Sequence, residues 1–589
     1  MPNEVLEAIE GMKTGKAAGL DGVAPDLLKL LHDEWIVELT DLFNRVFVTE
    51  YPTQWNNAKM YTLYKKGDRL DPGNYRGISI PLALAKVYDS VLSRRFRLWY
   101  TPCKEQAGSQ KGRGCEEQVL TLKLLIDTAR KTKQSLLIAF IDYEKAYDKV
   151  DRTKLFQMLD EQGCGSQFLK ALQHSMTETA GVIGSSTFTT GAGVKQGGAT
   201  SCPLFTFYID STVRALRNCG DDGWLRDMCC LLFMDDTAVV ATNEDSMAKK
   251  LKVLKQSTDQ IGMKIHPRKS QFMTINCTRA EPFQLDEVQV ALTTEYVYLG
   301  CLIRNANATQ VLSQEMLMKW KHVWKFASFL RKNGDAPFTV KRKVWESCVT
   351  AAIAYGCQTW LTTNRRAFEQ LYLTSLKSLL GVRPLTPNNL TVVESGVPGP
   401  LEHVEKLQRK FYRQILTASQ DSNCLSTAMQ IASDLRAPGM LYIRKVMANE
   451  PQKDKEREAV RQAQESSRAT AYKALNPSLE QSQIYRSPAS TCPKEMHRIA
   501  YTRMRLSSHR LRIETGRWAR IPREERMCSC GQSVQDEYHV LLRCQLTERA
   551  RRMLYGDRDL PQTLNELFDQ SDQNKVAELC YEALKISEH

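Results

Sequence analysis

The chain has 589 residues, and its 42% hydrophobic and 25% charged content is ordinary for a soluble globular protein of about three or four domains. No uninterrupted apolar run reaches about 18 residues and the amino-terminal segment is polar, so we expect neither a membrane span nor a signal peptide. These features argue against a secreted or membrane-embedded protein and predict an intracellular one without a membrane partner. The net charge of +14 suits a polyanionic partner.

In chain order, the first strand predicted from apolar patterning covers residues 136–141, with the sequence LLIAFI. This run has a β-branched end, and its length and composition are typical of a strand that is buried on both faces. Asp142 follows it directly. The carboxylate of Asp142 should therefore emerge at one edge of the sheet.

A hairpin is predicted at residues 229–241, where apolar runs lie on either side of Met-Asp-Asp-Thr. Its turn carries Asp235 and Asp236, so two strand ends can bring three acids together. Such carboxylates suit two Mg²⁺ ions held roughly 3.5 to 4 Å apart, which stabilise both the attacking and the leaving oxygen in phosphoryl transfer. The alternative is a structural turn, because aspartate tolerates turn geometry and is common in hairpins.

The following residues show mainly helical periodicity. Apolar side chains recur at steps of three and four between Leu312 and Leu330, and Asn333-Gly334 provides a stop. Residues 384–400 are rich in Pro, Gly and Asn and predict a domain boundary. Residues 451–483 are highly charged, which predicts a solvated helix or a mobile linker.

Seventeen cysteines are scattered along the chain without a disulfide framework, so most are expected to be reduced core residues. One cluster differs, because Cys528, Cys530, His539 and Cys544 form the pattern C-x-C-x₈-H-x₄-C. Thiolate and imidazole ligands in this pattern suit one structural Zn²⁺ ion, with Gly531 easing the turn and His539 on a short helix. The alternative is three free cysteines and a surface histidine.

Eight short segments occur in one order along the chain. They are MKTGKAAGLDGVAPDLLK (12–29), YTLYKKGDRLDPGNYRGISI (61–80), QAGSQKGRGCEEQVLTL (106–122), FIDYEKAYDKVD (140–151), GVKQGGATSCPLF (193–205), FMDD (233–236), GMKIHPRKSQFM (262–273) and YVYLGCLI (296–303). With these segments the sequence resembles the reverse transcriptase of a non-LTR retrotransposon, of the LINE or jockey-like kind. It departs from the usual pattern of that family at Gly77, Met234, Ala199 and Cys202.

The resemblance implies an α+β right-hand polymerase with fingers, palm and thumb, followed by a helical connecting region and a zinc-knuckle-like tail. The implied domains are the amino-terminal extension and fingers (1–135), the palm with part of the fingers interleaved (136–303), the thumb (304–383), a helical connector and charged linker (384–490) and a basic region with the CCHC motif (491–589). The chain begins almost at the first polymerase motif and few residues follow Cys544. An endonuclease domain is therefore expected to be lacking.

The resemblance also implies catalytic roles. Asp142, Asp235 and Asp236 would hold two Mg²⁺ ions, with Asp142 and Asp235 as the principal ligands. Lys269 would protonate the departing pyrophosphate, since a general acid at that position speeds such a step. The alternative for Lys269 is an ordinary surface lysine.

Nucleotide-binding roles follow in the same way. Lys65 and Arg76 would contact the negatively charged triphosphate, although Lys65 also fits a solvated basic turn. Tyr147 would close off the space beside the sugar and exclude the 2′-hydroxyl, which favours dNTPs over ribonucleotides. The alternative for Tyr147 is packing in the core. Gln196 and Gly197 would support the templating base and the nucleotide.

A basic segment lies just upstream of the cysteine cluster, where residues 501–520 contain six arginines and one acid. Arginine side chains bind phosphates through paired donors, and aromatic faces can stack on unpaired bases. The side chains expected to contact RNA or target DNA are Arg510, Arg512, Arg517 and Trp518. The alternative is a solvated basic helix.

The activity implied by the resemblance is RNA-directed DNA polymerisation, in which a primer 3′-hydroxyl attacks the α-phosphate of a dNTP and pyrophosphate leaves. The implied partners are a template RNA, expected to be the element's own transcript, and a primer or target-site DNA. The nucleus and a cytoplasmic ribonucleoprotein are the expected locations. Two alternatives stay open: a catalytically degenerate nucleic-acid-binding relic of the same element, and an RNA-dependent RNA polymerase, against which Tyr147 argues.

Overall fold

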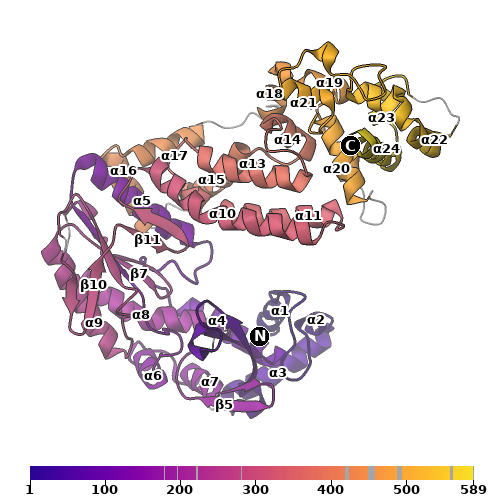
Figure 1. The fold of residues 1–589 in the computed structure, drawn as a ribbon. Helices are drawn as coiled ribbons and strands as arrows, with labels where there is room; N and C mark the ends of the chain where they lie inside the picture. The colour runs from indigo at the N-terminus through magenta and orange to yellow at the C-terminus, as the bar shows by residue number, and fades with distance from the viewer. Residues whose placement is uncertain are drawn as a thin grey trace. The chain divides into compact units, whose positions relative to one another are not determined.

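The computed structural model describes residues 1–589 except 178, 196, 221–222, 280, 418–422, 449–457, 487–493, 557–560 and 588–589. The chain forms two compact units, and Figure 1 labels many of their helices and some of their strands. Unit 1 comprises Met1–Asn305 and Ala418–Leu441, and unit 2 comprises Ala306–Thr417 and Tyr442–His589. None of the described helices is both long and apolar enough to cross a membrane.

Unit 1 is built around two sheets, with strand orders β2-β1-β4-β5 and β6-β7-β3-β8-β10-β9, and a separate β11-β12 hairpin. The strands are β1 (Asn57–Tyr64), β2 (Tyr75–Pro81), β3 (Leu136–Ile141), β4 (Thr179–Ile183), β5 (Ser186–Thr190), β6 (Cys230–Phe233), β7 (Asp236–Ala241), β8 (Gln271–Ile275), β9 (Phe283–Leu285), β10 (Val288–Leu292), β11 (Glu295–Tyr298) and β12 (Cys301–Arg304). The second sheet contains both strands expected to carry the catalytic acids.

Helices cover both faces of this second sheet. The helices of unit 1 are α1 (Pro2–Glu10), α2 (Pro25–Leu28), α3 (Asp33–Val48), α4 (Ala83–Trp99), α5 (Cys115–Thr132), α6 (Arg152–Glu161), α7 (Ser166–Met176), α8 (Ser201–Arg217), α9 (Glu244–Gln260) and α16 (Cys424–Asp434). Side chains of α8 and α9 pack in the core on one face, while α5 and α16 pack against each other on the opposite face (Figure 1). The sheet is thus buried on both sides.

Strand β3 confirms the strand predicted at residues 136–141. Its side chains alternate between the two cores, as a period of two requires: Leu137, Ala139 and Ile141 on the α8–α9 face, and Leu136, Ile138 and Phe140 on the α5–α16 face. All six residues are buried. This double burial explains the continuous apolar run in the sequence.

Unit 2 is helical in its described residues. Its helices are α10 (Ala308–Lys332), α11 (Phe338–Val344), α12 (Ala351–Ile353), α13 (Arg366–Leu380), α14 (Asn388–Ser395), α15 (Pro400–Thr417), α18 (Glu458–Glu465), α19 (Thr470–Leu475), α20 (Glu495–Arg505), α21 (Arg512–Trp518), α22 (Glu548–Tyr555), α23 (Leu564–Phe568) and α24 (Gln573–Ser587). Helix α17 (Pro438–Ala448) contains the sequence boundary between the units.

Helix α10 confirms the helix predicted from the periodicity between Leu312 and Leu330. It begins with a capping box, in which the side chain of Asn307 accepts from the N–H of Gln310, and it ends at Asn333 as the stop signal predicts. Residues 384–400 contain the buried helix α14 and lie within unit 2. The division into fingers, palm and thumb stays a prediction.

Candidate active site and metal cluster

The three predicted catalytic acids lie at one end of the central strands of unit 1. Strands β3 and β7 are antiparallel with Ile141 opposite Thr237, so the next position along each strand holds Asp142 and Asp236 respectively. Asp235 occupies the turn between β6 and β7, which confirms the predicted hairpin. We call Asp142, Asp235 and Asp236 the acid triad.

The surroundings of Asp235 and Asp236 disfavour their charged forms. Burial raises the pKa of Asp236 to about 6, and the charges of Asp235 and Asp142 add to this rise. Burial and the charge of Asp142 also raise the pKa of Asp235. These carboxylates resist ionisation together, and hard divalent cations are what such oxygen donors favour, so the residues present fit Mg²⁺.

This preference for the uncharged form predicts a pH-dependent stability change on removing Asp236. The raised pKa means that the folded protein holds the Asp236 proton more tightly than the unfolded chain, so ionisation between about pH 4 and pH 6 lowers the free energy of unfolding. In metal-free protein at pH 7.5, Asp236→Asn should therefore raise the free energy of unfolding by about 1 kcal/mol, a small value because the Asp236 side chain is packed among neighbours but is still reached by solvent, which screens its charge. Urea denaturation in chelator measures the change.

At pH 4 the same substitution should have a smaller effect on stability, because Asp236 is then protonated in the folded protein and only about half ionised in the unfolded chain, where its pKa is 3.8. Asp245→Asn, which removes an exposed acid from the first turn of α9, serves as the control and should change little at either pH. A destabilised Asp236→Asn variant at pH 7.5 would contradict this account of the acid triad.

Lys269 lies at the acid triad. Its Nζ is 3.3 Å from Oδ1 of Asp142. Two hydrogen bonds hold the segment around Lys269 against Asp142. The N–H of His266 donates to the carbonyl oxygen of Asp142 at 2.7 Å, and the N–H of Asp142 donates to Ser270 Oγ at 3.2 Å. The structure therefore brings together the lysine and the acid that the motifs placed at the site.

The predicted triphosphate-binding cations come from the β1-β2 hairpin. Leu63 is opposite Arg76 in the ladder, and the N–H of Lys65 donates to the carbonyl oxygen of Asn74 at 2.8 Å, which closes the loop. The charges of Arg76 and Lys65 lower the pKa of Asp235 and so offset part of the rise caused by burial. These cations therefore lie within electrostatic range of the acid triad.

Tyr147 packs beside the acid triad. Its ring stacks on Phe205 of α8, with centroids 4.4 Å apart and an angle of 11° between the planes, and its hydroxyl lies 3.9 Å from Cys202 Sγ. Burial raises the pKa of Tyr147, and the charge of Asp235 contributes to the rise. The stack fixes the ring on one side, while Cys202, a departure from the family pattern, contacts its hydroxyl.

Gly197 lies against strand β2. Its φ is +115°, and a Cβ atom at this position would be 2.5 Å from the carbonyl oxygen of Ser79. Both the backbone conformation and the close approach therefore require glycine. Gln196, the other residue predicted to support the templating base, lies outside the described residues.

Sequence reasoning left one aromatic residue near the acid triad unassigned. Tyr296 of β11 stacks on Phe140, with ring centroids 4.2 Å apart and planes 5° from parallel. Burial raises its pKa to about 12, and the charges of Asp142 and Asp236 contribute. Tyr296 belongs to the motif YVYLGCLI. The motif singled out this segment, but it did not indicate that Tyr296 lies near the acid triad.

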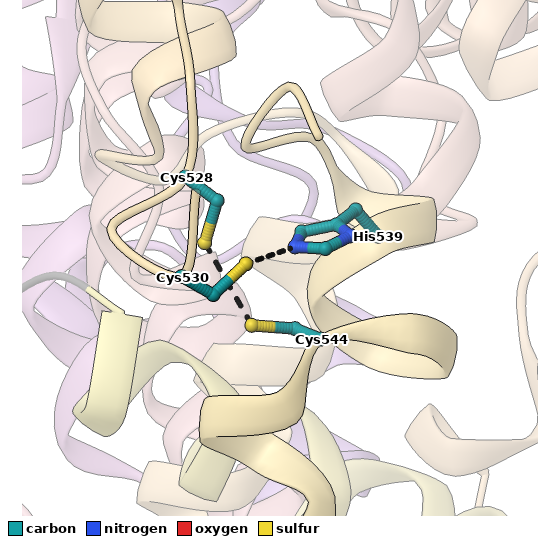
Figure 2. Close-up of side chains that lie close together, drawn as sticks. All are labelled: Cys528, Cys530, His539 and Cys544. Carbon is teal, nitrogen blue, oxygen red and sulfur yellow. Dashed lines mark hydrogen bonds between the residues drawn. The ribbon is translucent and has the colours of Figure 1, made fainter. Parts of the chain in front are cut away.

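The predicted zinc ligands converge in unit 2 (Figure 2). The ligand atoms of Cys528, Cys530, His539 and Cys544 all lie within 4.8 Å of one another. The Sγ atoms of Cys528 and Cys544 are 3.7 Å apart, and Cys530 Sγ is 3.1 Å from His539 Nε2. Zinc–sulfur bonds of about 2.3 Å place two sulfurs of a regular tetrahedron about 3.8 Å apart, so this cluster fits Zn²⁺.

Local backbone structure holds these ligands. Gly531 has a φ of +75° and its N–H donates to the carbonyl oxygen of Cys528 at 2.9 Å, as expected of a turn glycine. His539 begins a π-helical turn, His539–Arg543, which confirms the predicted short helix. The N–H of His539 donates to Asp536 Oδ1 at 2.9 Å, and the N–H of Cys544 donates to the carbonyl oxygen of His539 at 2.7 Å.

The cluster predicts that replacing Cys528 and Cys530 together by serine releases about one zinc ion per chain while unit 1 stays folded. Metal analysis of purified protein and the unfolding transition of unit 1 measure the two effects. Cys348→Ser, which changes an exposed cysteine of unit 2, should keep the parent zinc content. Equal zinc in the double variant and the parent would rule out the cluster as a zinc site.

Two of the predicted nucleic-acid-binding residues line a cavity of about 720 Å³ in unit 2. Arg517 and Trp518 line it, and the Arg383 guanidinium lies 4.0 Å from the centroid of the Trp518 ring, which is 46% exposed. Arg512 donates to the carbonyl oxygen of Met527 at 2.9 Å, and Arg510 is exposed. A cavity of this size can hold a nucleotide-sized ligand.

Other arginines of the same segment serve the interior of unit 2. Arg505 is buried and its Nε is 2.9 Å from a carboxylate oxygen of Glu394 on α14. Arg503 donates to the carbonyl oxygen of Gly381 at 2.8 Å. The basic segment is thus partly structural, because two of its arginines hold helix α20 against other parts of unit 2.

Residues 63–303 match the protein family described as "Reverse transcriptase (RNA-dependent DNA polymerase)". The matched segment contains the whole acid triad, Lys65, Arg76 and Tyr147. Together with the α+β architecture, this match confirms the fold class that the motifs predict.

Known proteins resemble this chain at moderate identity. The retrovirus-related Pol polyprotein from type-1 retrotransposable element R2 of Bradysia coprophila is 27% identical over 274 residues, which cover 44% of this chain and 30% of that protein. The probable RNA-directed DNA polymerase from transposon BS of Drosophila melanogaster is 24% identical over 402 residues, which cover 64% of this chain and 44% of that protein. The chain thus spans less than half the length of these relatives.

Among solved structures, apo telomerase from Candida tropicalis, truncated from the C-terminal domain, has a TM-score of 0.31 and 14% identity over 46% of this chain and 59% of that one. This likeness is too slight to support an argument. Residues 63–303 match a reverse transcriptase domain, and the chain is similar to proteins of non-LTR retrotransposons.

Proposed function

We propose that this protein is an RNA-directed DNA polymerase that copies the RNA of a non-LTR retrotransposon. The observation that carries the proposal is the acid triad at the ends of β3 and β7, with Lys65 and Arg76 within electrostatic range of it. Acids that bind cations and cations that bind a triphosphate are the two halves of a nucleotidyl-transfer site. Both lie within the reverse transcriptase domain.

In this proposal, Asp142 and Asp235 would be the principal ligands of two Mg²⁺ ions and Asp236 would assist. The bound ions would supply the positive charge that favours a deprotonated primer 3′-hydroxyl and stabilises the leaving pyrophosphate. Arg76 and Lys65 orient the triphosphate of the incoming dNTP. The attack of the 3′-oxygen on the α-phosphate forms one phosphodiester bond and breaks the bond to pyrophosphate.

Three further residues complete the proposed site. Lys269 exchanges its ion pair with Asp142 for the pyrophosphate and donates a proton to it. Tyr147, fixed by its stack on Phe205, fills the space of a 2′-hydroxyl and so selects dNTPs. Gly197 allows close approach to β2 and supports the template side with Gln196.

The carboxy-terminal residues are proposed to bind nucleic acid beside a structural zinc ion. Trp518 offers a half-exposed ring for stacking on an unpaired base, and Arg517 and Arg510 offer exposed charge for phosphates. The proposed partners are the element's own RNA and a primer or target-site DNA. Such partners would place the protein in the nucleus and in a cytoplasmic ribonucleoprotein.

Template-directed incorporation tests the proposed function. Purified protein is given a DNA primer on an RNA of known sequence, dNTPs, Mg²⁺ and one dideoxynucleotide at a time. We expect stops at positions that the RNA sequence dictates. A primer that is bound but never extended on any RNA template would instead favour the nucleic-acid-binding relic.

A further inference from the structure

Residues 105–108 run beside strand β6 toward the turn of the acid triad. The N–H of Ala107 donates to the carbonyl oxygen of Leu232, and the N–H of Leu232 donates to the carbonyl oxygen of Glu105, both at 2.9 Å. Gln106 and Leu232 form a parallel bridge. Strand β6 is the outermost strand in the order of its sheet, so this segment covers an edge that would otherwise expose unpaired backbone groups.

The turn that this segment reaches has an unusual backbone. Met234 has a φ of +58°, which lies in the left-handed region that residues other than glycine rarely adopt. Asp235 follows it directly, and Asp236 begins β7. The conformation of Met234 therefore sets the direction in which the two carboxylates leave the hairpin, and something must hold that conformation.

One buried side chain bonds both polar groups of Met234. The N–H of Met234 donates to Gln106 Oε1 at 2.8 Å, and Gln106 Nε2 donates to the carbonyl oxygen of Met234 at 3.2 Å. The N–H of Gly108 also donates to Gln106 Oε1, at 2.8 Å. The glutamine is 0% exposed, so water cannot replace these bonds if they are lost.

Gly108 also lies closely against the turn at Met234. A Cβ atom on Gly108 would lie 2.5 Å from the backbone nitrogen of Met234, closer than such atoms approach in real proteins. Gln106 itself is anchored, because its carbonyl oxygen accepts from Arg113 Nη1 at 2.8 Å. The close approach of Gly108 to Met234 and the anchored backbone of Gln106 thus both favour the contact between Gln106 and Met234.

We propose that Gln106 is a positioning residue of the active site: its side-chain amide holds Met234 in the left-handed conformation and thereby aims Asp235 and Asp236. This inference rests on the proposed polymerase function, since it concerns the same acids. Gln106 contacts no reacting group, so it acts through the turn alone. Its loss should lower the rate of the chemical step and leave dNTP binding largely intact.

The variant Gln106→Met keeps the volume of the side chain and removes only its amide. We expect kcat of primer extension to fall by about 10- to 100-fold, because a small misplacement of catalytic groups has effects of that size, with KM for dNTP little changed. Gln118→Met is the matched control. Gln118 is 1% exposed and donates to the carbonyl oxygens of Glu105 and Leu232 at 2.8 and 2.9 Å, but has no bond to Met234. Its kcat should stay close to that of the parent.

Repeating the substitution in Met234→Gly protein distinguishes a positioning role of Gln106 from a general loss of structure. Glycine adopts a positive φ without strain, so the loss caused by Gln106→Met should be smaller in Met234→Gly protein than in the parent. An equal loss in both backgrounds would overturn the proposal, because the effect would then not pass through the conformation of Met234. An unchanged kcat in Gln106→Met would overturn it as well.

Hydrogen exchange of a peptide covering residues 230–241 tests the same contact without any activity. We expect faster exchange of this peptide in Gln106→Met than in Gln118→Met, because only Gln106 bonds the backbone of Met234. If the parent fails to extend primers while this difference is present, the proposed function fails and the positioning contact stands. If the parent extends primers and neither exchange nor kcat changes in Gln106→Met, the positioning contact fails alone.

Discussion

Primer extension should fall by about 10³-fold or more when Asp235 and Asp236 are both replaced by asparagine, because the site then loses the charges that hold the metal ions at the reacting phosphate. Asparagine keeps the size of each side chain, so the hairpin β6-β7 should still form. Single-turnover extension on an RNA template measures the rate.

Two controls distinguish a loss of catalysis in the double variant from a loss of folding. The folded variant should be at least as stable as the parent in metal-free buffer at pH 7.5, since burial and mutual repulsion raise the pKa values of both acids. Asp245→Asn, on the exposed start of α9, should extend primers like the parent. A double variant that keeps more than a small fraction of the parent rate would remove the acid triad from the mechanism.

Ribonucleotide rejection should weaken by about 10- to 100-fold in Tyr147→Ala, since a pocket that rejects an extra hydroxyl by shape discriminates by roughly that factor. The ring of Tyr147 stacks on Phe205, so truncation opens the space beside the sugar. The ratio of kcat/KM for matched dNTP and rNTP pairs measures the change. The Tyr147→Ala variant should still incorporate dNTPs.

Tyr147→Phe is the matched variant for this experiment. It keeps the stacked ring and loses only the hydroxyl that lies 3.9 Å from Cys202 Sγ, so its sugar selectivity should equal that of the parent. Unchanged rejection of ribonucleotides in Tyr147→Ala would show that the ring does not select the sugar. Tyr147 would then no longer favour a DNA polymerase over an RNA-dependent RNA polymerase.

Local patterns predicted much of the site. The apolar run 136–141 predicted β3 because a strand buried on both faces needs apolar residues at every position, and Asp142 follows it. The apolar runs around Met-Asp-Asp-Thr predicted the hairpin. The same holds for helix α10, whose end at Asn333 is marked in the sequence. Each of these signals lies within a few residues of the feature it predicts.

Contacts between distant residues could not be predicted in this way. The bonds between Gln106 and Met234 join positions 128 residues apart, and nothing near Gln106 in the sequence indicates them. Arg505 belongs to the segment predicted to bind nucleic acid, yet it is buried against Glu394, 111 residues away. Both outcomes depend on the packing of whole elements, which periodicity and composition do not specify.

The register of the sheet is a further case. The motifs place Asp142 and Asp236 at strand ends, but only the pairing of Ile141 with Thr237 brings them to the same edge. A shift of one residue would turn the side chains of β3 to opposite faces and exchange the two cores. The sequence predicted that the acids could meet, but the register that places Asp142 and Asp236 at the same edge is seen only in the structure.

The central claim is that this chain polymerises DNA on RNA, and binding and extension measured in one sample test it most directly. Labelled DNA primer on an RNA template is titrated with protein until it is fully bound, and dNTPs with Mg²⁺ are then added. The account predicts that the bound primer is extended and that the double asparagine variant binds it equally but leaves it unextended. Full binding by a folded parent with no extension would contradict the account and identify a nucleic-acid-binding relic.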